Sequence, residues 1–297
     1  MIDTLEAVPC NLCGATDVST ILDVGARGRV VRCRCCGLGY VSPRPASTLH
    51  LYEDEGYFGG DPPGGGGHGY DSYESDLRAL EPYFERLARE IAGIRPGGAL
   101  LEIGCAAGSF LARAREQGFA VSGVEPSPSA RRLAEATLGV TVLAPTVEQA
   151  EVPPQSFDVV VLLQTIEHLA DPKATLSRIR QLLRPGGLLL LTTPNRSSWL
   201  SRLTGRRWFE YKPPEHLYYF TGATMRRMLA ASGFSQTVVS RDVHRYPPGF
   251  VLGRLRRYTP RSAPIVGAVE RLLPQALREF VLPVYYGSMK VRAFRDR

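Results

Sequence analysis

The sequence lacks any long apolar run and any recognisable leader. No stretch approaches the roughly 18 uninterrupted apolar residues of a transmembrane helix, so none is expected. The first residues, MIDTLEAVPCN, have neither the basic start nor the apolar core of a secretory signal, which makes the cytoplasm the expected location. With 297 residues, 44% of them hydrophobic and 22% charged, the chain is expected to form one large globular domain with appendages, or two domains.

Acidic side chains are scarce in the C-terminal third. Residues 196–297 carry 19 basic and 6 acidic side chains, a net charge of +13, whereas residues 1–195 carry 17 basic and 23 acidic ones, a net charge of −6. Of the 36 basic residues in the chain, only three are lysines. The positive third favours nucleic acid, an anionic membrane surface or a phosphorylated substrate as a partner. A solvated, arginine-rich face is the plainer alternative.

Strands and helices alternate through the middle of the chain. Near-continuous apolar runs predict strands at 99–103, 121–124, 140–143, 157–163 and 188–193. Helical spacing and capping residues predict helices at 76–91, 109–117, 129–137, 172–183 and 221–233. Two further strands are expected at 235–243 and 289–294. This pattern predicts a Rossmann-like, doubly wound α/β fold around a mostly parallel, seven-stranded sheet.

A glycine-rich turn follows the first of these strands, in the run LEIGCAAGSF (101–110). An open α/β sheet binds its ligands at this place, outside the carboxyl ends of the strands. A dinucleotide would require G-x-G-x-x-G to cradle a pyrophosphate. Here Glu102 stands two positions before Gly104, and its carboxylate would repel a pyrophosphate but suits an ammonium group or a ribose. The ligand that joins adenosine to an amino acid without phosphate is S-adenosylmethionine (SAM).

The pattern E-x-G-x-x-x-G resembles motif I of the class I SAM-dependent methyltransferases, and the segments from 99 to 243 resemble that family's fold in order. The resemblance implies that Glu125, 21 residues after Gly104, binds both ribose hydroxyls. It also implies that Thr146 and Val147 pack beside the adenine. The implied cofactor site contains Glu102, Gly104, Cys105, Gly108, Glu125, Thr146, Val147 and Gln164.

Five of the six cysteines lie within the first 36 residues. The spacing C-x2-C-x19-C-x2-C, formed by Cys10, Cys13, Cys33 and Cys36, is typical of a tetrahedral zinc site. Cys35 is an alternative to Cys33 as a ligand. Because few apolar residues surround this segment, bound zinc is expected to supply folding free energy.

The N-terminal segment from Cys10 to the run CGLGYVSPRP (36–45) resembles the zinc module of sugar C-methyltransferases. We therefore expect a zinc-ribbon-like module over residues 1–58. A Gly/Pro-rich linker or lid is expected over 59–75, and the methyltransferase domain over 76–297 with an insertion at 245–288.

Two histidines are candidates for proton transfer from an acceptor. His168 follows the fourth strand and therefore lies at the cofactor end of the sheet, where it can serve as a general base. Glu167 beside it can orient an imidazole or assist a metal. His216, in the run PPEHLYY, is the second candidate. The alternative is that Glu167 and His168 only cap a helix and shape the pocket.

The run from 194 to 220 resembles the branch of the family that contains ubiquinone-biosynthesis enzymes and tailoring enzymes of glycans and natural products. We therefore expect SAM-dependent O-methylation of a sugar, a glycan or another small molecule, with phosphorylated or lipid-linked acceptors and peripheral membrane contact left open. C-methylation of a deoxysugar is an alternative. An RNA or protein methyltransferase is another, but nucleic acid is disfavoured because no RNA-binding motif is recognisable. A non-catalytic scaffold is a third.

Overall fold

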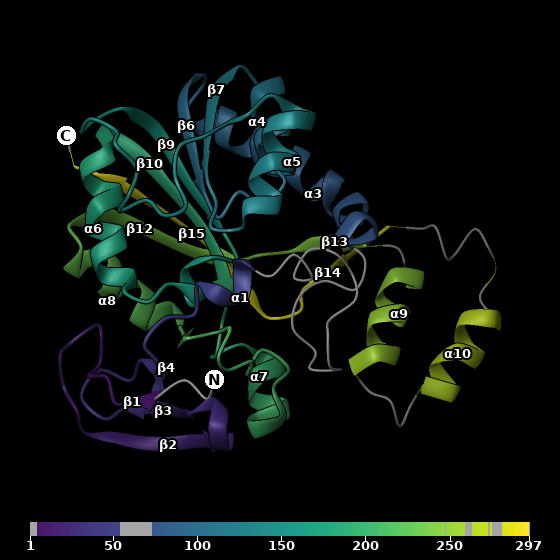
Figure 1. Ribbon diagram of the computed structural model, residues 1–297. Helices are drawn as coiled ribbons and strands as arrows, with labels where there is room; N and C mark the ends of the chain where they lie inside the picture. The colour runs from purple at the N-terminus through teal and green to yellow at the C-terminus, as the bar shows by residue number, and fades with distance from the viewer. Residues whose placement is uncertain are drawn as a thin grey trace.

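The computed structural model describes residues 5–53, 73–246, 248–258, 263–272, 274 and 281–296. A seven-stranded sheet occupies its centre, in the order β12-β15-β10-β9-β6-β7-β8 (Figure 1). The strands are β6 (Gly98–Ile103), β7 (Phe119–Val124), β8 (Thr141–Val142), β9 (Phe157–Leu163), β10 (Leu183–Pro194), β12 (Phe234–Arg241) and β15 (Ser288–Arg295). Only β15 runs antiparallel to its neighbours, so the carboxyl ends of the other six strands meet at one edge.

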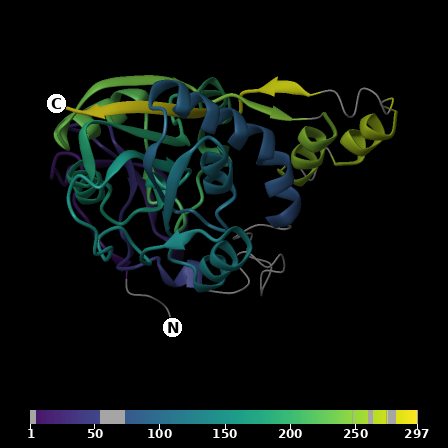
Figure 2. The same ribbon diagram turned by 90° about the horizontal axis from the view of Figure 1, so that it is seen from above.

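Helices cover both faces of this sheet (Figures 1 and 2). One face carries α3 (Tyr73–Ile94), α4 (Ser109–Glu116) and α5 (Pro128–Leu138), and the other carries α6 (Pro172–Leu182) and α8 (Gly222–Ala231). Successive strand residues point to opposite faces. Leu100 accordingly packs into the α3–α4 core, and Leu101 packs into the core beneath α6 and α8. The predicted strands and the doubly wound fold are thus confirmed.

Local sequence explains where several helices begin. The side chains of Ser127, Asp171 and Thr221 cap α5, α6 and α8 by accepting a backbone N–H three residues later. Pro128 and Pro172 occupy the first positions of α5 and α6, where the missing N–H costs nothing. The helix predicted at 76–91 is longer and begins at Tyr73; the predicted linker otherwise lies outside the described residues.

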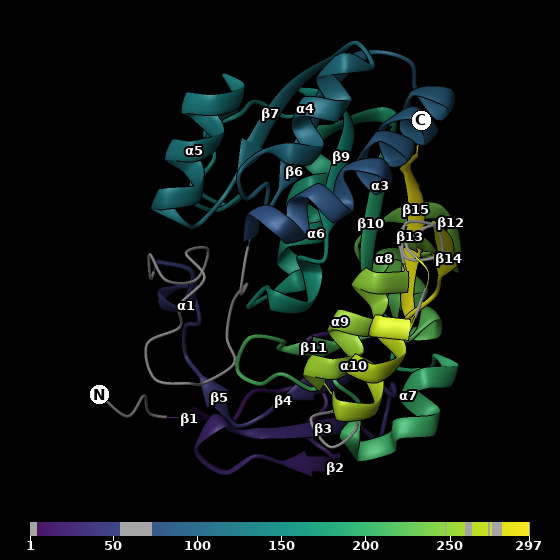
Figure 3. The same cartoon turned by 90° about the vertical axis from the view of Figure 1, so that its right-hand side faces the viewer.

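The cysteine-rich module forms a second sheet, in the order β11-β4-β3-β2 (Figure 3). Its strands are β2 (Val18–Asp23), β3 (Arg29–Cys33), β4 (Gly39–Val41) and β11 (Tyr218–Tyr219). Nearby lie the strand pair β1 (Leu5–Glu6) and β5 (Arg44–Pro45) and the short helix α1 (His50–Glu53). Because β11 comes from the segment after β10, the module and the large sheet share one apolar core.

The C-terminal insertion extends away from the sheet. Strands β13 (His244–Tyr246) and β14 (Leu282–Val284) form an antiparallel ribbon, from which α9 (Pro248–Tyr258) and α10 (Ala263–Leu272) project (Figures 1 and 2). Helix α7 (Trp199–Thr204) follows β10. Within the described part of the chain, no helix has the length and apolarity needed to cross a bilayer.

Candidate functional site

The turn after β6 has the backbone of a ligand-binding loop. Gly104, Ala106 and Gly108 have φ angles of 77°, 47° and 79°, in the left-handed region that glycine adopts without strain. A Cβ on Gly104 would stand 2.6 Å from Thr165 Oγ1 in the loop after β9. The turn therefore packs closely against its neighbour and needs glycine at this position.

Two buried carboxyl groups lie side by side at this edge. Glu125 Oε2 accepts a hydrogen bond from Ala106 N, and Oε1 accepts one from Ser127 N, each at 2.8 Å. Glu102 Oε2 is buried and has no hydrogen-bond partner among the described residues. Burial, together with the charge of Glu125, raises the pKa of Glu102 well above its ordinary value. An unpaired buried carboxyl group requires a partner, and a cationic ligand group would fit it.

The other predicted cofactor residues differ in surroundings. Burial raises the pKa of the Cys105 thiol, whose sulfur would collide at 2.4 Å with a Cβ on Gly123. Cys105, in the turn after β6, therefore packs its neutral thiol against Gly123 of β7. Thr146 is half-buried and Val147 is buried after β8. Gln164, with a φ of 52°, holds its side chain on Thr192 Oγ1 at 3.2 Å.

The loop after β9 brings together Glu167, His168 and His216. The rings of His168 and His216 meet edge-to-face with centroids 4.7 Å apart. His168 Nδ1 lies 2.8 Å from the Tyr52 hydroxyl and 3.0 Å from the carbonyl of Glu215. His216 Nδ1 lies 3.0 Å from the carbonyl of Glu210. The sequence prediction named both histidines but gave no reason for them to touch.

Glu167 and His216 of this cluster are buried, His168 is partly buried, and the three side chains are largely uncharged. Burial lowers the pKa of His168 to about 4 and that of His216 well below its ordinary value. Burial also raises the pKa of Glu167 to about 8, although Thr193 Oγ1 donates to it at 2.9 Å. One donor atom from each of the three side chains lies within 4.8 Å of the others, so the cluster has the geometry to hold a divalent cation. Without a cation, the neutral imidazoles can accept protons.

Four cysteine sulfurs converge in the N-terminal module. The sulfurs of Cys10 and Cys36 are 3.4 Å apart, those of Cys13 and Cys33 are 3.6 Å apart, and all four lie within 4.8 Å of one another. A tetrahedral zinc with bonds of about 2.3 Å requires sulfur separations of about 3.8 Å. Cys35 is exposed and does not belong to this group. The four predicted ligands therefore fit a zinc ion.

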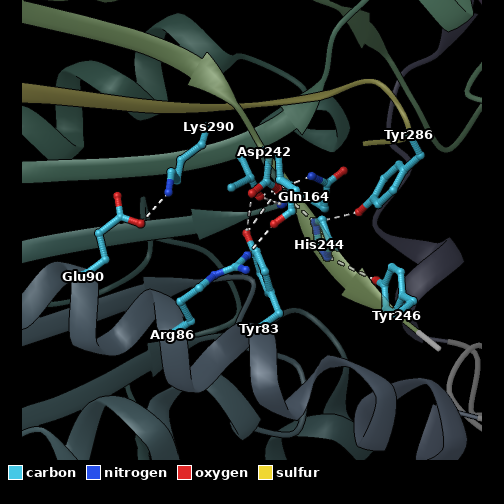
Figure 4. Close-up of polar contacts among 11 residues, drawn as sticks. Tyr83, Arg86, Glu90, Gln164, Asp242, His244, Tyr246, Tyr286 and Lys290 are labelled. Carbon is cyan, nitrogen blue, oxygen red and sulfur yellow. Dashed lines mark hydrogen bonds and ion pairs between the residues drawn. The ribbon is translucent and has the colours of Figure 1, made fainter. Parts of the chain in front are cut away.

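The sequence prediction assigned no role to His244, which lies in a buried polar cluster beyond β12 (Figure 4). His244 Nε2 lies 3.0 Å from Asp242 Oδ2 and 2.8 Å from the Tyr286 hydroxyl, and its Nδ1 lies 3.1 Å from the Tyr246 hydroxyl. Tyr83 of α3 donates its hydroxyl to Asp242 and stacks on the imidazole at 4.0 Å. The D-x-H spacing at a predicted strand end is the one signal the sequence offered.

A cavity of 790 Å³ opens beside the carboxyl ends of β10 and β12. Its walls include Asn195, Ser198, Trp199, Arg202, Arg241 and Tyr285. The guanidinium of Arg241 lies 5.4 Å above the ring of Tyr285. None of the described residues that line this cavity is acidic, so it suits an anionic or ring-bearing molecule.

A family model described as a methyltransferase domain matches residues 73–239, more than half of the chain. The ubiquinone biosynthesis O-methyltransferase of Idiomarina loihiensis is 27% identical over 168 residues, which cover 52% of this chain and 69% of that protein. The enzyme of the same name from Nitrobacter winogradskyi is 33% identical over 157 residues, covering 45% and 58%. The chain thus spans 69% of the length of the first relative and 58% of the second.

Solved structures show the same fold. A putative methyltransferase from Bacillus halodurans superimposes with a TM-score of 0.52 and 14% identity, covering 72% of this chain and 99% of that chain. A SAM-dependent methyltransferase from Archaeoglobus fulgidus superimposes with a TM-score of 0.51 and 18% identity, covering 75% and 98%.

Proposed function

Because this chain belongs to the methyltransferase-domain family, we propose that it transfers the methyl group of SAM to a hydroxyl oxygen of a small-molecule acceptor, such as a sugar or a glycan. The observation that carries the proposal is the unpaired, buried carboxyl group of Glu102 beside the glycine turn and Glu125. This arrangement suits a ligand with cationic groups and a ribose but without phosphate. SAM supplies a methyl group already activated on a sulfonium.

We assign each of the cofactor residues to a different part of SAM. Glu125 keeps lone pairs beyond its two backbone hydrogen bonds, and these can accept hydrogen bonds from ribose hydroxyls. Glu102 faces a cationic group. Gly104 and Gly108 allow the backbone to approach the ligand closely. Thr146 and Val147 border the adenine, and Gln164 borders the reacting end at the carboxyl end of β9.

The acceptor meets His168 at the loop after β9. Methyl transfer is an in-line displacement, so the chain mainly aligns the acceptor oxygen with the methyl group. Burial lowers the pKa of His168 to about 4, so the imidazole is neutral at physiological pH and has an unprotonated ring nitrogen that can receive the hydroxyl proton. The same burial makes it a weaker base than a free imidazole. His216, whose ring touches that of His168, holds it in place or takes its role.

The cavity with Arg202 and Arg241 supports an acceptor that carries an anionic group, such as a phosphorylated sugar. Trp199 on its wall is 56% exposed and offers a face on which a sugar ring can stack. The names of the two ubiquinone biosynthesis O-methyltransferases support transfer to oxygen rather than to carbon or nitrogen. We further propose that Cys10, Cys13, Cys33 and Cys36 hold a structural zinc.

Transfer of labelled methyl from SAM into fractionated cell extract tests this function. Label is expected in the small-molecule or glycan fraction, at a position released as an O-methyl group. His168→Ala is expected to slow transfer by about two to four orders of magnitude while SAM binding persists. Thr20→Ala, on the exposed edge of β2, is the control. Label confined to RNA or protein would overturn the assignment of a small acceptor.

A further inference from the structure

The cysteine module touches the loop after β9 through the turn from Cys10 to Cys13, which we call the knuckle and which carries two of the proposed zinc ligands. Asn11 lies between Cys10 and Cys13. Its Nδ2 donates to Asp171 Oδ1 at 2.8 Å, and its Oδ1 accepts from Lys173 N at 3.1 Å. Asp171 Oδ1 also accepts from Ala174 N at 2.9 Å as the N-cap of α6. The knuckle thus adds a hydrogen bond to the N-cap residue of α6, at the end of the loop 164–171.

A second set of contacts holds the middle of the same loop. Arg44 donates to the carbonyl of Ala170 at 2.7 Å, and the hydroxyl of Tyr218 donates to that carbonyl at 3.1 Å. Leu217 N donates to the carbonyl of Glu167 at 2.8 Å, and Val41 N of β4 donates to the carbonyl of Leu217 at 2.9 Å. The sheet of the module therefore reaches the backbone of residue 167 through one intervening residue.

A third contact is made by the segment that leaves the module. Tyr52 of α1 places its hydroxyl 2.8 Å from His168 Nδ1 and its ring edge-to-face on the imidazole, with centroids 5.9 Å apart. The loop 164–171 is thus held at Glu167 by Leu217, at Ala170 and Asp171 by the module, and at His168 by Tyr52. All these contacts fall on the acceptor side of the sheet rather than on β6 or β7, where Glu102 and Glu125 lie.

We propose that the cysteine module is an internal clamp that fixes the loop 164–171 for acceptor methylation, with Asn11 as its positioning residue. The expected effect on methyl transfer rests on the proposed function. The contacts between the module and the loop do not depend on that function. A zinc ion on the four cysteines would hold the knuckle, the knuckle holds Asp171, and the loop between Gln164 and Asp171 keeps His168 in place beside the acceptor. On this view, the module acts within the chain and is not a grip for RNA or protein.

Asn11→Ala tests the clamp because it leaves all four cysteines in place. Zinc content and SAM affinity are expected to stay within twofold of the wild type. Amide hydrogen exchange over 164–171 is expected to accelerate, and labelled methyl transfer is expected to slow by about tenfold, since small misplacements of reacting groups are costly. Thr20→Ala, on the exposed edge of β2, is the matched control and is expected to change neither readout.

An exchange of partners separates positioning from general destabilisation. Asn11→Asp alone places two carboxylates together and is expected to match Asn11→Ala. Adding Asp171→Asn lets the amide nitrogen at position 171 donate to the carboxylate at position 11 while the amide oxygen still accepts from Ala174 N, so both slow exchange and methyl transfer should recover.

Unchanged exchange over 164–171 in Asn11→Ala, or loss of zinc from that variant, would overturn the clamp. Faster exchange with an unchanged transfer rate would overturn its role in acceptor positioning. If the wild type transferred no methyl group, the proposed function would fail, while hydrogen exchange and the partner swap would still decide whether the clamp exists.

Discussion

The hydroxyl of Tyr83 lies 3.1 Å from both carboxylate oxygens of Asp242, although 159 residues separate them in sequence. The contact joins α3 to the segment that follows β12, and a hydrogen bond from Arg86 to the carbonyl of Val243 joins the same two elements. The ion pair of Glu90 with Lys290 joins α3 to β15 (Figure 4). Asp242 is buried, so its oxygens need hydrogen-bond donors from the protein. Helix α3 is thereby fixed against the segment that follows β12.

Tyr83→Phe is expected to destabilise the fold by about 1–3 kcal/mol, because it leaves a buried carboxylate with one donor fewer. Urea unfolding followed by circular dichroism measures this change. Tyr285→Phe is the control, since the described residues offer its hydroxyl no hydrogen bond. Equal stability of the two variants would show that Asp242 is satisfied without Tyr83.

Glu125→Ala is expected to weaken SAM binding by about 1–3 kcal/mol, since it removes the acceptor of the ribose hydroxyls. Titration calorimetry with SAM and with its demethylated product measures the loss. Glu135→Ala, on exposed α5 surface, should leave the affinity unchanged. Wild-type affinity in Glu125→Ala would place the ribose elsewhere.

Binding of SAM is expected to release a proton from Glu102. The pKa of this carboxyl group is raised well above 4.5 in the folded protein, so it is protonated over a range in which a free carboxyl group is ionised. A cationic ligand favours the charged form and lowers the pKa again. Calorimetry in buffers of different ionisation enthalpy counts the released protons, and Glu102→Gln should abolish that release.

The raised pKa of Glu102 also makes the stability of the ligand-free fold depend on pH. Above pH 4.5 the folded protein holds the Glu102 proton more tightly than the unfolded chain does, so this group's contribution to stability declines as pH rises toward the raised pKa. Glu102→Gln is expected to flatten the ligand-free stability profile over that range. If the stability of Glu102→Gln changed with pH in parallel with that of the wild type, the raised pKa of Glu102 would be contradicted.

Cys10→Ser is expected to lose the bound zinc and to lower the melting temperature, because the metal contributes folding free energy to the module. Cys35→Ser is the matched control and should retain one zinc per chain, since Cys35 lies outside the cluster of four sulfurs. Metal analysis with thermal unfolding measures both effects. Zinc retention by Cys10→Ser together with loss from Cys35→Ser would reassign the ligands.

Much of the fold follows from local patterns. The apolar runs of β6, β9 and β10 are explained by burial on both faces, and Ser127, Asp171 and Thr221 mark helix starts that neighbouring residues alone decide. The glycine turn could be placed because Gly104 and Gly108 must stand between a strand and a helix. The spacing of Cys10, Cys13, Cys33 and Cys36 likewise selects the four sulfurs that the fold brings together.

The sequence by itself therefore determined the doubly wound sheet, the glycine turn at the carboxyl end of β6 and the sulfur cluster, because each depends on residues that are near one another in the chain or on a regular period. Only the tertiary structure decided which distant side chains meet. It joined β11 to the module's sheet, Asn11 to Asp171, His168 to His216 and Tyr83 to Asp242. These pairs are set by the packing of whole elements against a shared core, and no local propensity encodes the distance between such partners.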